Sequence, residues 1–298
     1  MLTIVIVVVF FFRFHIRSSS WKIMKITIIG CGYVGTAVAR FWQQSGHVLT
    51  VTTTNKEKVA ELSSLAERVV VMKGSEYDKI LAAVEGAEMV LLSVGARTRN
   101  REIYRATYVE TGQNLVAAVK ETGTVSQIIY TSSYGILGDK NGAWVDETEK
   151  VAPVNENGRV LVETEELLLR ARTEKLKVCI FRLAGIYGVG RELIKIFASW
   201  SGSTRPGTGK NYINWVHLDD IVGAIELGRE QQLAGIYNLS CDVPLVKGEF
   251  YERLFKKHGM NPLSWDGVEE KVASSNVRLA NGKIKRMGLK LIHPEIEF

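Results

Sequence analysis

The sequence contains little cysteine and little proline. Its three cysteines, Cys31, Cys179 and Cys241, are an odd number, lie far apart and have no metal-ligand spacing. They argue against a disulfide framework or a metal site, and they favour the cytoplasm or another reducing compartment. With only five prolines, no internal repeat and no low-complexity linker, residues 24–298 are predicted to form a single domain.

The excess of positive over negative charge is also small. The formal net charge is +6, and Arg13, Arg17 and Lys22 contribute three of these charges, which leaves +3 on the rest of the chain. So mild a balance, without a basic stripe or an aromatic RNA-binding signature, argues against nucleic acid as a partner. The 46% hydrophobic and 23% charged content is ordinary for a soluble protein.

One apolar run, LTIVIVVVFFF at residues 2–12, needs a separate interpretation. It is too short to cross a bilayer as a helix, which takes about 20 residues, so no stable membrane insertion of the core is expected. It also lacks the preceding positive charge and the small-residue cleavage site of a secretory signal. Residues 1–23 are therefore either an extension upstream of a natural start at Met24 or a membrane-associating or organellar targeting leader.

From Lys25 onward, short apolar runs alternate with helical periodicity. This alternation predicts an α/β fold, a Rossmann-type doubly wound parallel sheet with helices on both faces. The last third mixes short helices and strands, and it is predicted to form a small α+β C-terminal substrate lobe, mainly from about residue 186 onward. Strands are expected at 25–30, 47–53, 68–74, 88–95, 126–133 and 177–185, and helices at 36–46, 56–66, 76–85, 102–122 and 159–173.

A glycine-rich motif, GCGYVG at residues 30–35, lies between the first predicted strand and helix. Gly30 would permit a tight turn, and Gly32 would let the backbone approach a pyrophosphate. Gly35 would let the helix pack closely on the strand, while the helix N-terminus stabilises phosphate charge. Tyr33 and Val34 complete the motif, which predicts dinucleotide binding; a purely structural turn is the alternative.

The choice between NAD and NADP is read at the end of the second strand, where an acidic residue would bind the ribose of NAD. Here Thr53 stands 18 residues after Gly35, followed by Thr54, Asn55 and Lys56. No carboxylate would repel a 2′-phosphate, so NADP is favoured over NAD, although no arginine fork is present. The alternative is a solvated helix cap, with Thr54 or Asn55 starting the next helix.

Together with the glycine motif, four later segments resemble the extended short-chain dehydrogenase/reductase superfamily, in its NAD-dependent epimerase/dehydratase group. They are IIYTSSYGILGD (128–139), FRLAGIYGVGRE (181–192), INWVHLDDIVGAI (213–225) and GIYNLSCDVPL (235–245). The resemblance covers nearly all of residues 24–298 and implies a sheet of about seven strands with a substrate-binding C-terminal lobe. Val94, Gly95 and Thr131 complete the expected cofactor-binding set.

The resemblance also implies a serine, a tyrosine and a lysine that perform acid-base catalysis around hydride transfer. Ser133 occupies the serine position, with a turn-capping role as the alternative. Where the YxxxK motif is expected, Asn157 stands for tyrosine and Leu161 for lysine, and neither side chain can perform those roles. Tyr134 and Tyr187 are the possible substitutes for the missing acid, with packing as the alternative for each.

Further residues also have expected roles. The resemblance makes His217 and Asp220 structural, and Asp219 or Asp220 is expected to cap a helix. A metal or triad role for His217 lacks a second ligand nearby in the sequence. Three arginines are candidates for holding an anionic group, with solvated or structural roles as the alternative: Arg182, Arg191 and Arg205. Residues 202–211 are interpreted as a mobile loop over the cleft. Residues 97–105 are interpreted as a cofactor-side lip, with a solvated helix start as the alternative.

Two functions therefore remain open. The first is an NAD(P)-dependent oxidoreductase or epimerase-like enzyme acting on a small hydroxyl- or carbonyl-bearing substrate, with its acid relocated. The second is a non-catalytic dinucleotide-binding protein. The sequence carries no signal for an oligomeric state.

Overall fold

The computed structural model describes residues 22–98, 100–268 and 275–298. The apolar run at 2–12, with most of the N-terminal extension, lies outside these residues. Within the described ranges, no helix combines the length and the apolar character needed to cross a membrane.

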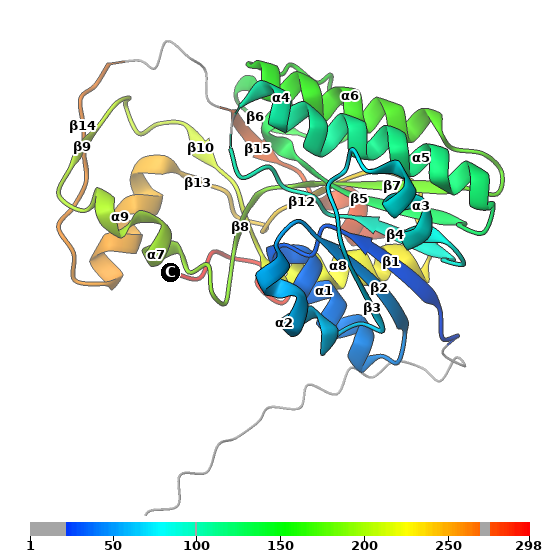
Figure 1. Ribbon diagram of the computed structural model, residues 1–298. Coiled ribbons are helices and arrows are strands. Elements are labelled where there is room, and N and C mark those ends of the chain that lie inside the picture. Colours follow the sequence, from blue (N-terminus) through cyan, green and yellow to red (C-terminus); the bar gives the residue numbers. More distant parts are fainter. Residues whose placement is uncertain (1–21, 99, 269–274) are drawn as a thin grey trace, which may run out of the picture.

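Seven parallel strands form the central sheet (Figure 1). Their order is β12-β7-β5-β4-β1-β2-β3, so the chain starts in the middle and winds outward first to one side and then to the other. The predicted doubly wound architecture is confirmed, and it brings the carboxyl ends of β1 and β4 together where the winding reverses. The strands are β1 (Lys25–Ile29), β2 (Val48–Thr53), β3 (Arg68–Val71), β4 (Met89–Leu92), β5 (Gln127–Ser133), β7 (Lys177–Leu183) and β12 (Gly235–Leu239).

Helices cover both faces of the sheet (Figure 1). On one face, Trp42 and Ile221 join the core cluster of α1 (Tyr33–Gln44), α2 (Val59–Ser63) and α8 (Leu218–Glu230). On the other, Ile80 and Leu115 belong to a separate cluster beneath α3 (Tyr77–Val84), α5 (Thr111–Thr122) and α6 (Glu156–Arg170). The apolar stripes that predicted these helices therefore face the sheet.

The helix predicted at 102–122 is divided into three pieces. A π-helical turn, η2 (Ala106–Glu110), separates α4 (Arg101–Arg105) from α5. The Thr111 hydroxyl donates a hydrogen bond over 3.2 Å to the Ala106 carbonyl five residues earlier. Hydrophobic periodicity does not reveal such a wider turn. The helix predicted at 56–66 likewise begins as a 3₁₀ turn, η1 (Lys56–Lys58), before α2.

A smaller lobe lies beside the sheet (Figure 1). Its core is aromatic: Phe197, Trp215, Phe250 and Tyr251 pack with ring centroids 5.0 to 5.8 Å apart. The lobe is discontinuous in the sequence, because α8 and β12 return to the sheet. Its elements are β8 (Gly185–Tyr187), α7 (Leu193–Phe197), η4 (Ala198–Trp200), β9 (Thr204–Arg205), β10 (Tyr212–Ile213), β11 (Trp215–His217), β13 (Leu245–Val246), α9 (Lys247–Lys257) and β14 (Ser264–Trp265).

The edge strand β12 is protected by charged side chains. The Lys283 ammonium donates to the Ile236 carbonyl over 2.7 Å, and the Asn238 amide donates to the Glu147 carboxylate over 2.8 Å. These contacts hinder another strand from pairing there.

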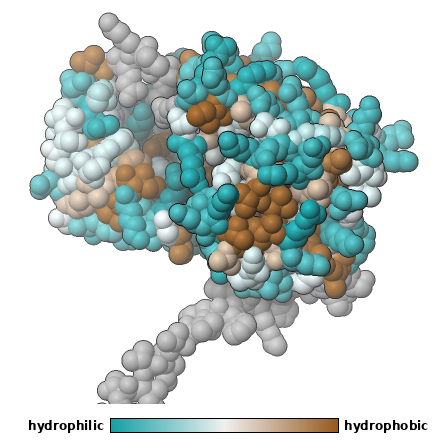
Figure 2. All heavy atoms as spheres, in the orientation of Figure 1, coloured by the Kyte–Doolittle hydropathy of each residue, from teal (hydrophilic) through white to brown (hydrophobic). Residues whose placement is uncertain are grey.

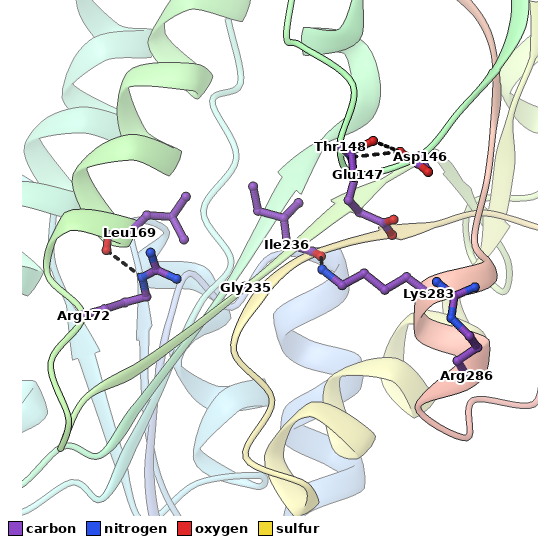
Figure 3. Close-up of a pocket in the computed structure, with 9 residues that line it drawn as sticks. All are labelled: Asp146, Glu147, Thr148, Leu169, Arg172, Gly235, Ile236, Lys283 and Arg286. Carbon is purple, nitrogen blue, oxygen red and sulfur yellow. Dashed lines mark hydrogen bonds between the residues drawn. The ribbon is translucent and has the colours of Figure 1, made fainter.

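A cavity of about 480 Å³ lies beside these contacts (Figure 3). It is lined by Asp146, Glu147, Thr148, Leu169, Arg172, Gly235, Ile236, Lys283 and Arg286. None of the predicted site residues lines this cavity.

Two further strands and a helix lie near this edge: β6 (Asp139–Val145) pairs with β15 (Asn276–Leu279), and α10 (Gly282–Arg286) follows. Figure 2 shows that hydrophilic side chains cover most of the face seen in this orientation. The large apolar side chains exposed among the described residues are scattered along the chain: Ile23, Ile103, Trp144, Val154, Val189, Val243, Val268 and Ile292.

A buried ion pair joins α6 to the sheet. The Arg182 guanidinium on β7 donates to the Glu165 carboxylate over 2.8 Å, and the two side chains are only 5% and 3% exposed. The Ser132 hydroxyl on β5 donates to the same carboxylate over 2.6 Å. These bonds connect β5, β7 and α6 next to Ser133, the residue that follows Ser132.

Removing one member of this pair should be costly, because the other charge would stay buried without compensation. We expect Arg182→Met to lower the free energy of unfolding by about 3–5 kcal/mol. The exposed Arg170–Glu166 pair on the same helix provides the control, and Arg170→Met should cost about 0–1 kcal/mol. Urea unfolding followed by circular dichroism measures both, and equal costs would contradict the expectation.

Candidate functional site

The glycine motif forms a turn that is closely packed on two sides. Gly30 has a φ of +97°, and a Cβ at this position would lie 2.5 Å from the Ser93 carbonyl oxygen. A Cβ at Gly35 would lie 2.3 Å from the Gly30 carbonyl oxygen. The loop thus fits between β4 and α1 only when both positions lack a side chain.

Thr52 at the end of β2 anchors this loop. Its hydroxyl accepts a hydrogen bond from the Gly30 amide over 3.0 Å, and its carbonyl accepts one from the Cys31 amide over 2.8 Å. Sequence reasoning missed Thr52, whose signal was the threonine-rich stretch at 50–54. The Cys31 side chain is buried, and burial raises its thiol pKa to about 12, which matches the expected packing role.

The amino end of α1 is open to a ligand. Gly32 begins the helix without a side-chain cap, and the first turn carries no acidic residue. A Cβ at Gly32 would meet no atom within 4 Å. An uncapped helix start that lacks carboxylates attracts anions, and the bare backbone leaves room for a phosphate. These residues fit the pyrophosphate of a dinucleotide.

The other two residues of the motif point elsewhere. The Tyr33 hydroxyl donates to the Val189 carbonyl over 2.9 Å and so connects the loop to the smaller lobe. Val34 is buried in the core, so that only its backbone is at the helix start.

The end of β2 carries the groups expected to select the cofactor. Thr53 is buried, and its hydroxyl accepts from the Asn55 amide over 3.1 Å. The Asn55 side chain accepts from the Glu57 amide over 3.0 Å and caps η1, so the capping alternative is observed at this residue. Thr54 and Lys56 are exposed and present a hydroxyl and an ammonium group.

The ends of β4 and β5 lie next in the sheet. Gly95 is exposed and Val94 half-buried after β4, and the Thr131 hydroxyl on β5 donates to the Ser93 hydroxyl over 3.1 Å. Because β2, β1, β4 and β5 are neighbours, the fold gathers the predicted cofactor-binding residues at one edge of the sheet. Whether they bind a cofactor remains a prediction.

A cavity of about 450 Å³ opens at the same edge. Sequence reasoning missed its two tyrosines, Tyr104 and Tyr108, which lie within and just beyond the stretch interpreted as a lip or helix start. Asn100 caps α4, so the helix start is observed. Arg97 and Thr98 line the cavity, and their role as a cofactor-side lip stays a prediction. The full lining is Ala96, Arg97, Thr98, Tyr104, Tyr108, Ser133, Gly135, Asn155, Asn157, Gly158 and Leu161.

Ser133 both lines this cavity and caps a turn. Its hydroxyl oxygen accepts from the Gly135 amide over 3.2 Å at the start of η3 (Tyr134–Leu137). Asn157 and Leu161 line the cavity from α6, which Asn155 caps. The serine therefore shares one cavity with the two positions where tyrosine and lysine were expected.

The two tyrosines suggested as substitute acids lie elsewhere. Tyr134 is absent from the cavity lining; it packs against the core, and burial raises its pKa despite hydrogen bonding with Asn214. The Tyr187 hydroxyl donates to the Glu295 carbonyl over 3.4 Å and accepts from the Glu297 amide over 3.1 Å. Burial raises the Tyr187 pKa to about 12. Both placements argue against direct proton transfer in this cavity.

The three arginines are engaged in structure. Arg182 lies in the buried ion pair and cannot hold a substrate anion. Arg191 donates to the Ile186 carbonyl over 2.9 Å, and Arg205 stacks 3.9 Å from the centroid of the Trp200 ring. Within the expected mobile loop at 202–211, β9 pairs with β14, so part of that loop is held in a ladder.

His217, and not Asp219 or Asp220, caps α8: its Nδ1 accepts from the Asp219 amide over 3.2 Å. Asp220 accepts from the amides of Ile292 and His293 and so ties down the C-terminal segment, the structural role that was expected. The fold also brings the His293 ring to a centroid distance of 3.6 Å from His217. These two histidines and Asp219 place ligand-type atoms within 4.8 Å of one another. Sequence spacing could not find this cluster.

Comparisons with known proteins agree with this geometry. The model of the NAD dependent epimerase/dehydratase family matches residues 26–240. Protein YeeZ of Escherichia coli (strain K12) is 30% identical over 244 residues, 80% of this chain and 85% of YeeZ.

Solved structures share the fold at lower identity. UDP-glucose 4-epimerase of Thermotoga maritima, solved with UDP-glucose, is 20% identical with a TM-score of 0.77, over 90% of this chain and 94% of that one. DesIV of Streptomyces venezuelae, a dTDP-glucose 4,6-dehydratase solved with NAD and TYD, is 18% identical with a TM-score of 0.77, over 92% and 93%.

The close contact at Gly35 predicts a specific loss of stability. We expect Gly35→Ala to lower the free energy of unfolding by about 1–3 kcal/mol, because the new methyl group overlaps the Gly30 carbonyl. Gly223→Ala in α8 is the matched control, since its Cβ would meet only Leu289 at 3.9 Å. This control should be neutral or stabilise by up to about 1 kcal/mol through helix propensity. Thermal unfolding distinguishes the two, and a neutral Gly35→Ala would show that the loop is not closely packed.

Proposed function

The chain belongs to the NAD dependent epimerase/dehydratase family, and we propose that it uses a nicotinamide dinucleotide to oxidise or reduce a small hydroxyl- or carbonyl-bearing substrate. The observation that carries this proposal is the bare, uncapped helix start at Gly32, next to a cavity that contains Ser133. When bound, the nicotinamide supplies or accepts the hydride.

The chain's own residues would divide the remaining work. Backbone amides at the start of α1 hold the pyrophosphate. The carboxyl ends of β4 and β5, at Val94, Gly95 and Thr131, line the path toward the cavity. There the Ser133 hydroxyl, fixed by the Gly135 amide, orients a substrate oxygen.

NADP is the proposed cofactor, with NAD as its competitor. Thr54 and Lys56 are exposed at the end of β2, and residues 53–56 contain no carboxylate that would repel a 2′-phosphate. The competitor is retained because DesIV, which shares the fold, holds NAD.

A second candidate function is a non-catalytic dinucleotide-binding protein. Asn157 and Leu161 favour it, because we place them at the family's tyrosine and lysine positions and they line the cavity from α6. Asparagine has no proton of useful acidity, and leucine cannot ionise. The retained Ser133 and the presence of the smaller lobe favour the enzyme.

Gly32→Ala tests the binding site apart from the fold. Its methyl group would meet no protein atom but would occupy the path of the pyrophosphate, so we expect dinucleotide affinity to fall about tenfold or more while the thermal midpoint changes little. Quenching of protein fluorescence during titration with NADP and NAD measures the affinity, and Gly223→Ala is the control. Unchanged affinity in Gly32→Ala, or no binding of either nucleotide to the wild type, would overturn the proposed site.

Thr54→Asp tests cofactor choice. A carboxylate at this exposed position should repel the 2′-phosphate, so we expect NADP affinity to fall about tenfold while NAD affinity is unchanged or higher. Thr204→Asp, exposed in the smaller lobe, changes the net charge equally and should alter neither affinity. Equal effects of Thr54→Asp on both nucleotides would contradict NADP recognition at the end of β2.

A further inference from the structure

The cavity that holds Ser133 contains two tyrosines in place of the one missing from α6. Tyr104 and Tyr108 both line it, and their rings lie 4.6 Å apart at an interplanar angle of 42°. Tyr108 is the better placed for chemistry, because its hydroxyl lies 3.4 Å from the Ala96 amide, just beyond the end of β4. That amide fixes the phenol oxygen at the edge where the strands β1, β4 and β5 end.

The backbone around Tyr108 is unusual in a way that supports this placement. Tyr108 lies in the π-helical turn η2, between α4 and α5. Single π-helical turns inside α-helices occur frequently at functional sites, because they redirect side chains and interrupt regular hydrogen bonding. Just before this turn, Arg105 forms two hydrogen bonds to Glu163 of α6, 2.6 and 2.7 Å long, which hold it against the wall that carries Asn157.

We propose that Tyr108 is the proton-transfer residue of this cavity and replaces the tyrosine absent at position 157. The inference rests on the proposed function. Ser133 orients the substrate oxygen from the end of β5, and Tyr108 lines the same cavity from η2, in the segment that follows the neighbouring strand β4.

The chemistry balances with a nicotinamide dinucleotide as the redox partner. In the oxidation direction, the substrate hydroxyl gives its proton to the Tyr108 phenolate. The C–H bond of the carbon that carries this hydroxyl breaks, and its two electrons leave with the hydrogen as hydride to the oxidised nicotinamide. A C=O bond forms on the same carbon. In the reduction direction, Tyr108 donates its proton to the carbonyl oxygen as the hydride arrives. Arg97, which lines the cavity, supplies a positive charge that favours the phenolate.

The nicotinamide ring is positive when oxidised and neutral when reduced, and this difference permits a test that needs no substrate. A phenolate at Tyr108 would attract only the oxidised ring, because only that ring is positive. From about pH 7 to about pH 10, the affinity for oxidised nucleotide should therefore rise about tenfold while that for reduced nucleotide stays level.

Other ionisable groups on the elements around Tyr108 need to be separated from it. The pKa of Tyr130 on β5 is raised well above its usual value by burial, so it stays neutral in this range. Glu163 and Glu165 of α6 are held in ion pairs with Arg105 and Arg182. Tyr104 is the remaining phenol and provides the matched control.

The experiment titrates wild type, Tyr108→Phe and Tyr104→Phe with oxidised and reduced nucleotide over this pH range. Circular dichroism confirms that each variant is folded. We expect the rise for oxidised nucleotide in the wild type and in Tyr104→Phe, and its loss in Tyr108→Phe. As a readout on the unaltered chain, oxidised nucleotide should increase the ultraviolet absorption of tyrosinate, because the positive ring stabilises the phenolate of Tyr108.

A rise that persists in Tyr108→Phe, or that is missing from the wild type, would overturn the assignment of Tyr108 while leaving the proposed function intact. Failure of the wild type to bind any nicotinamide nucleotide would instead overturn the proposed function, and this inference with it. The two failures are therefore distinguishable in one series of titrations.

Discussion

The close approach of the glycine loop to its neighbours is the constraint on which the rest of the site depends. A side chain at Gly30 or Gly35 would overlap a backbone carbonyl, so the loop can follow this path only because both positions are bare. The same path leaves the start of α1 uncapped beside Gly32. A structural requirement for close packing thus produces an anion-binding position, because unpaired amides and the helix dipole face solvent there.

The parallel sheet collects chemistry from distant parts of the chain. Residues after β1, β2, β4 and β5 meet at one edge because parallel neighbours end on the same side. Buried side chains hold that edge in place. Among them is the ion pair of Arg182 and Glu165, whose carboxylate also accepts a hydrogen bond from the Ser132 hydroxyl. In front of it, the bond from Tyr33 to the Val189 carbonyl joins the loop to the smaller lobe. The glycine loop is therefore held by hydrogen bonds to the sheet at Thr52 and to the smaller lobe at Val189.

Family membership and cavity contents carry different information. The family match and the shared fold account for the glycine loop, the sheet and the lobe. The cavity has its own composition, with asparagine and leucine on α6 and two tyrosines on α4 and η2. The same architecture can host different chemistry, because the reaction depends on which side chains reach the substrate. Tyrosine on a π-helical turn can supply an acid without any change in the sheet.

The sequence by itself determined the doubly wound sheet, the turn at Gly30 and the packing role of Gly35, because apolar periodicity and glycine positions are local signals. It also placed Ser133 at a strand end. Only the tertiary structure decided that Arg182 is buried against Glu165, that His217 meets His293, and that Tyr108 shares a cavity with Ser133. The physical reason is separation along the chain: these contacts join segments whose proximity is set by strand order and helix packing, which no local pattern of residues records.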